Sequence, residues 1–73
     1  MYTLIDEDGF IKARISKRTI KNTLKYNPRY VKVYKNMGKE YLQVIEGFYL
    51  EYSRAFDGSV RIYCHPNSFL RED

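Results

Sequence analysis

With 73 residues, 44% of them hydrophobic, the chain is long enough for one small domain, residues 1–73, and too short for two. Its apolar runs are much shorter than the ~20 residues that a membrane-spanning helix needs, and we expect no signal peptide, because the first residues lack its charged and apolar regions. The single cysteine, Cys64, excludes an internal disulfide. These features predict a cytoplasmic protein without membrane attachment.

Charge is segregated along the chain beneath a net value of +4. Residues 1–11 carry −3 and residues 36–73 carry −2. Residues 12–35, here named the basic segment, contain nine Lys or Arg and no acid. If the nine acids of the chain were spread evenly, a stretch of this length would contain about three of them. Segregated charge informs about partners more than about fold, so the basic segment indicates an anionic partner.

In chain order, the first two elements are strands at 2–5 and 10–15, joined by an Asp- and Gly-containing turn at 6–9. The two-residue period of the second strand places Ile11, Ala13 and Ile15 on one face, which we expect to be the core face. Lys12 and Arg14 then lie on the solvent face.

A short helix follows from Ser16, a good N-cap, through Tyr26, and Asn27-Pro28 ends it. Ile20, Thr23 and Leu24 form a narrow apolar stripe on this helix.

A basic stripe lies beside the apolar one, because Lys17, Lys21 and Lys25 recur every four residues and Arg18 continues them. Like charges at this spacing repel by a few tenths of a kcal/mol per pair, and no acid on the helix relieves them. Stability alone does not account for this stripe.

The remaining segments favour strands. A strand is expected at 30–35 and a turn at 36–39, whereas 40–54 fits either two strands or a helical stripe. Gly47 favours two strands, because it would cost a helix about 1 kcal/mol. A hairpin turn at 56–59 precedes a strand at 60–64, which His65-Pro66 ends, and the last three residues are expected to fray.

This order predicts an α+β fold: a small antiparallel sheet of five to six short strands, curled or barrel-like, with one helix inserted after the second strand.

The chain lacks the residue patterns of catalysis and metal binding. Cys64 and His65 are neighbours on a strand and point to opposite faces, so they form neither a dyad nor a pair of zinc ligands. Asp6, Glu7 and Asp8 lack the further oxygen ligands of a calcium loop and fit a solvated turn. We therefore expect no enzymatic activity, no metal and no cofactor.

A basic, tyrosine-bearing face is the most informative feature of the chain. Tyr30 and Tyr34 are about 13 Å apart along the expected strand, with Lys32 between them, an arrangement that suits base stacking and phosphate contact. Two plainer interpretations remain open: a lysine-rich face can simply be solvated, and the tyrosines can pack inward. The predicted binding residues are Lys12, Arg14, Lys17, Arg18, Lys21, Lys25, Arg29, Tyr30, Lys32 and Tyr34.

Two functional hypotheses follow from this face. The first is a small non-catalytic protein that binds DNA or RNA. The alternative is an inhibitor or adaptor of the kind carried by phages or mobile elements, which docks its basic face on an acidic or nucleic-acid-binding surface of a host protein such as a nuclease. A homodimer is compatible with both, because the core is small.

Overall fold

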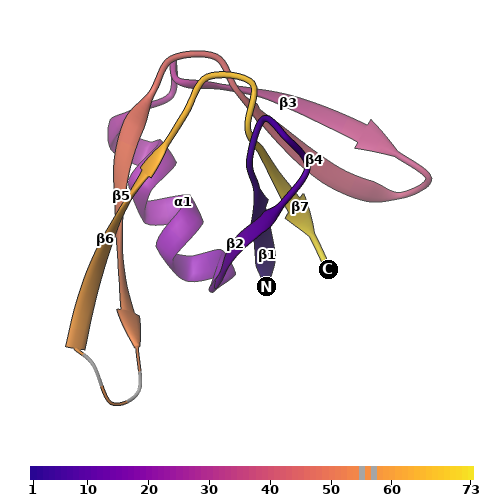
Figure 1. Ribbon diagram of the computed structural model, residues 1–73. Coiled ribbons are helices and arrows are strands. Elements are labelled where there is room, and N and C mark those ends of the chain that lie inside the picture. Colours follow the sequence, from indigo (N-terminus) through magenta and orange to yellow (C-terminus); the bar gives the residue numbers. More distant parts are fainter. Residues whose placement is uncertain (55, 57) are drawn as a thin grey trace.

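The computed structural model of the protein describes residues 1–54, 56 and 58–73 (Figure 1). The element order confirms the α+β prediction and the place of the helix after the second strand. The elements are β1 (Tyr2–Ile5), β2 (Ile11–Ile15), α1 (Lys17–Tyr26), β3 (Val31–Asn36), β4 (Lys39–Val44), β5 (Phe48–Arg54), β6 (Gly58–Cys64) and β7 (Phe69–Glu72).

The strands form two antiparallel sheets: the predicted sheet of five to six strands is present with five strands, and a second, two-stranded sheet was not expected. The larger sheet has five strands in the order β2-β1-β7-β4-β3, and β5 pairs with β6 in a separate two-stranded sheet. The ambiguous segment 40–54 resolves into β4 and β5, with Gly47 between them as predicted. The expected turn at 56–59 includes residue 57, which lies outside the described residues.

The C-terminal segment is the clearest departure from expectation, because it does not fray. Residues 69–72 form β7 at the centre of the larger sheet, paired with β1 on one side and β4 on the other. Leu70 lies opposite both Leu4 and Leu42 and is fully buried. The chain ends are adjacent as a result (Figure 1).

The core lies between one face of the five-stranded sheet and a second layer made of α1 and the β5–β6 hairpin (Figure 1). The helix begins as predicted, because the Ser16 hydroxyl accepts a hydrogen bond from the backbone N–H of Thr19 at 3.2 Å. Of the described residues, none belongs to a helix that is long and apolar enough to cross a membrane. The buried apolar residues are Tyr2, Leu4, Ile15, Ile20, Leu42, Val44, Phe48, Leu50, Tyr52, Cys64 and Leu70.

The prediction that Ile11, Ala13 and Ile15 of β2 all face the core holds at one end of the strand and fails at the other. Ile15 is buried, but Ile11 is 66% exposed. The register with β1 shifts between Leu4 and Ile5: Ala13 is paired with Leu4, and Ile11 is paired with Ile5. An irregularity of this kind breaks the two-residue period, and Ile11 turns away from the core.

Shortening Ile20 is expected to destabilise the fold, because this side chain anchors α1 in the core and is only 1% exposed. Ile20→Val should lower the free energy of unfolding by about 0.5–1.5 kcal/mol and Ile20→Ala by about 2–5 kcal/mol in urea titrations followed by circular dichroism. The control is Tyr26→Ala on the same helix, at a side chain 79% exposed. A loss from Tyr26→Ala as large as that from Ile20→Ala would contradict this packing.

The Cys64 thiol is expected to be inert in the folded protein. Burial raises the pKa of Cys64 to about 11, and the thiolate is the reactive form. At pH 7.5 the native protein should react with Ellman's reagent at least about 100-fold more slowly than the protein in concentrated urea. The Cys64→Ser variant supplies the blank, and equal rates in the two solvents would show that the thiol is accessible.

Candidate nucleic-acid interface

Three of the nine cations of the basic segment are paired with acids from the two ends of the chain. Arg14 Nη2 lies 3.0 Å from Asp73 Oδ2, and Lys17 Nζ lies 3.5 Å from Glu72 Oε2. Asp73 also accepts a hydrogen bond from the Thr3 hydroxyl at 2.8 Å. This hydrogen bond and the one from Arg14 lower the pKa of Asp73, so its carboxylate stays charged at neutral pH.

The third paired cation is Lys12, whose Nζ lies 3.5 Å from Asp6 Oδ2. Asp6 accepts hydrogen bonds from the backbone N–H groups of Phe10 and Asp8 at 2.8 and 2.9 Å. These contacts, the one from Phe10 first, lower the pKa of Asp6. The acidic turn thus neutralises the first cation of the basic segment.

The other six cations make no ion pair within the described parts of the chain. They lie on the exposed surface in two groups. The first group belongs to α1 and the loop after it, and the second to β3. These residues are Arg18, Lys21, Lys25 and Arg29 in the first group, and Lys32 and Lys35 in the second.

Two of the predicted elements of the interface lie on opposite sides of the five-stranded sheet. The helix packs on the core side, where Ile20 is buried. The register places Val33 opposite the buried Leu42, so Lys32 and Tyr34 lie on the other side of the sheet. The helical basic stripe and the Lys32–Tyr34 pair are therefore separate surfaces and not one continuous face.

Tyr30 does not lie on the face that carries Tyr34. Its ring stacks on Phe48, with centroids 5.7 Å apart and planes inclined by 19°, and it packs against the core. The strand begins only at Val31, so the alternation that was expected to align Tyr30 with Tyr34 does not extend to it. Tyr34 remains exposed, and Lys32 Nζ lies 5.3 Å from the centroid of its ring.

Side chains outside the basic segment share the surface of Tyr34. Tyr41 lies directly opposite Tyr34, Arg71 opposite Tyr41, and Phe69 opposite Gln43. Together with Lys32 and Tyr34 they form the surface here named the outer face, the side of β3, β4 and β7 that points away from the core. Sequence reasoning missed these four residues. Tyr41 and Gln43 come from the ambiguous segment 40–54, Arg71 was expected to fray, and no element was predicted at Phe69. The two-residue period of Leu42 and Val44 indicates that Tyr41 and Gln43 share the opposite side of their strand, whereas β7 is too short to carry such a signal for Phe69 and Arg71.

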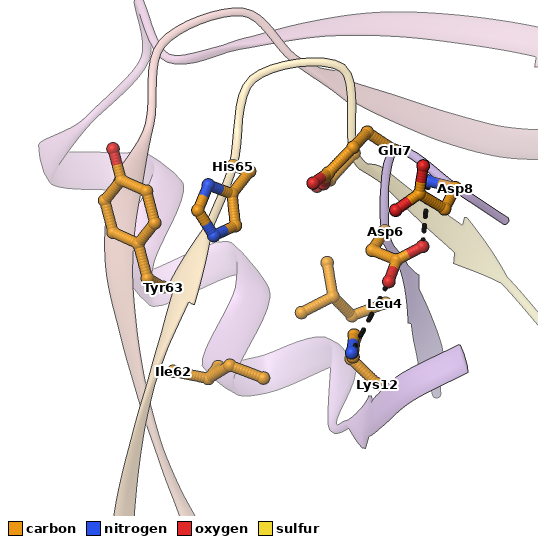
Figure 2. Close-up of a pocket in the computed structure, with 9 residues that line it drawn as sticks. Leu4, Asp6, Glu7, Asp8, Lys12, Ile62, Tyr63 and His65 are labelled. Carbon is orange, nitrogen blue, oxygen red and sulfur yellow. Dashed lines mark hydrogen bonds and ion pairs between the residues drawn. The ribbon is translucent and has the colours of Figure 1, made fainter. Parts of the chain in front are cut away.

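A pocket of about 470 Å³ separates the acidic turn from the β6 strand (Figure 2). Glu7 and His65 face each other across it, and Tyr63 stands beside His65. The described residues contain no group of three or more His, Cys, Asp and Glu side chains placed to hold a metal ion. The carboxylates of the acidic turn repel phosphate, so this pocket suits a nucleic acid less well than the basic surfaces do.

A second group of aromatic side chains lies on the exposed side of the β5–β6 hairpin. The Arg61 guanidinium carbon lies 4.2 Å from the Tyr49 ring centroid, and the rings of Tyr49 and Tyr63 lie 4.9 Å apart. The Tyr63 ring also meets the edge of His65 at 4.6 Å. Glu51 pairs directly with Arg61 in this hairpin and places a negative charge on the same side. This side suits phosphate less well than the outer face does.

Comparisons of the chain with protein-family models, with curated proteins and with solved structures each found no match.

Proposed function

We propose that this protein is a non-catalytic nucleic-acid-binding protein. The observation that supports the proposal best is the number of cations that remain unpaired after folding. Six of the nine cations of the basic segment stay exposed without an acid partner among the described residues, although acids are available at both ends of the chain. Such charges attract a polyanion and release its counterions on binding.

The distribution of the paired cations adds to this argument. The paired cations are the first three of the basic segment, two on β2 and one at the start of α1. Asp6, Asp73 and Glu72 neutralise Lys12, Arg14 and Lys17, respectively. The later turns of the helix, the loop after it and β3 have no such neutralisation within the described residues. The positive field is therefore concentrated in residues 18–35, which narrows the predicted interface.

Binding should depend steeply on salt concentration. With some five phosphate contacts, affinity should fall about 100- to 500-fold between 50 and 200 mM salt, because each neutralised phosphate contributes a slope of about −0.7 to −0.9. Fluorescence anisotropy of labelled single-stranded DNA, duplex DNA and RNA measures this fall. The absence of binding to every probe at 50 mM salt would overturn the proposal and leave an acidic protein surface as the partner to seek.

The unpaired lysines of α1 should contribute more to nucleic-acid affinity than the lysines that are paired with acids. Lys21→Gln combined with Lys25→Gln should weaken binding to all sequences and reduce the magnitude of the salt slope by about 1.4–1.8. The matched control is Lys12→Gln combined with Lys17→Gln, which removes the same net charge from residues already paired with acids. Equal losses from the two double variants would mean that net charge acts without a localised interface.

A further inference from the structure

The outer face gathers aromatic rings from three neighbouring strands of one open sheet. Tyr34 on β3 and Tyr41 on β4 are directly opposite each other, and Phe69 on β7 is opposite Gln43, two residues from Tyr41. A shallow groove of about 480 Å³ runs over this face and is lined by Tyr34, Lys35, Asn36, Tyr41, Gln43 and Phe69. The rings therefore line one continuous depression.

The rings of the outer face are exposed, in contrast to the other side of the same strands. Tyr34 is 40% exposed and Phe69 is 37% exposed, whereas Leu42 and Leu70 between them are buried. The exposed rings contribute little to the core, because each strand turns only one side toward it. An exposed group of rings on a sheet is a surface on which flat apolar ligands can stack.

The outer face carries more cations than acids. Asp73, directly after β7, lies on the same side of the sheet, where it is paired with Arg14 and accepts a hydrogen bond from Thr3, the residue opposite Arg71. The acids of β3, β4 and β7 are Glu40 and Glu72. Glu40 accepts a hydrogen bond from the Tyr2 hydroxyl at 2.9 Å, and Glu72 pairs with Lys17, both on the core side. On the outer face, Lys32 and Arg71 therefore flank the rings without an acid from these three fully described strands.

The spacing of the rings suits bases that are not stacked on one another. Tyr34 and Phe69 are two strands and two residues apart, which places their Cα atoms about 12 Å apart. This is several times the 3.4 Å rise of stacked bases in a duplex. In a duplex the flat faces of the bases are covered by their neighbours, so only a single strand presents them to the rings.

We propose that the outer face binds single-stranded nucleic acid by stacking bases on Tyr34 and Phe69, while Lys32 and Arg71 contact the backbone phosphates. This inference rests on the proposed function and gives it a substrate class and a site. Tyr41 lies between the two stacking positions and lines the groove that the nucleic-acid strand occupies. The helical cations on the other side of the sheet then contact further phosphates and make no stacking contact.

The test compares a labelled 12-nucleotide oligothymidine with a 12-base-pair duplex at 50 mM salt. Tyr34→Ala and Phe69→Ala should each weaken binding to the single strand by about 5- to 150-fold and binding to the duplex by less than about twofold. Tyr34→Phe keeps the ring and should bind like the wild type. Tyr49→Ala, at the exposed tyrosine of the β5–β6 hairpin, is the matched control and should also bind like the wild type. Circular dichroism of each variant confirms that it is folded.

The outcomes separate this inference from the proposed function. Wild-type binding to the single strand that survives both alanine substitutions within about twofold would overturn the stacking site and leave nucleic-acid binding in place. Equal losses on single strand and duplex would also overturn it, because stacking requires uncovered bases. If the wild type bound neither probe at 50 mM salt, the proposed function would fail, and the inference with it.

Discussion

The five-stranded sheet depends on β7, which is the last strand in the sequence and the central strand of the sheet. The N-terminal hairpin of β1 and β2 and the later hairpin of β3 and β4 have no pairing with each other, and β7 is hydrogen-bonded to both. Leu70 completes the apolar surface between Leu4 and Leu42 on the core side. Because Phe69 and Arg71 alternate with Leu70, the pairing that closes the core also places a ring and a cation on the outer face. The four residues of β7 therefore contribute both to the core and to the proposed site.

The return of the chain to its start also redistributes charge. Along the sequence, the acids of the two ends are far from most of the basic segment, but β7 brings Glu72 and Asp73 beside Lys17 and Arg14. These pairs are partly exposed, so they contribute little to stability and chiefly decide which cations remain available. The helical stripe beyond Lys17 keeps its charges, at the cost of repulsion between like neighbours. A surface that tolerates this repulsion is suited to an anionic partner.

Much of the fold follows from local patterns. The helix from Ser16, the strands of the first hairpin, the Gly47 junction and the antiparallel α+β class were all predictable, because caps, turns and two-residue periods act over short distances. The pairing of β7 was not, since a four-residue strand between polar neighbours carries almost no periodic pattern. The position of Tyr30 was missed for a related reason: the start of β3 decides its face, and strand ends are poorly marked in sequence.

The sequence by itself determined the composition of the proposed interface: a segment rich in Lys and Arg, free of acids and interspersed with tyrosines. The tertiary structure alone decided how these residues are divided. It neutralised Arg14 and Lys17 through contacts with the other end of the chain, and it placed the helix and Tyr34 on opposite sides of one sheet. It also joined Tyr41, Phe69 and Arg71 to the outer face. The physical reason is that charge and residue type are local properties, whereas the side of a sheet on which a residue lies depends on strand register and on which strand becomes the neighbour.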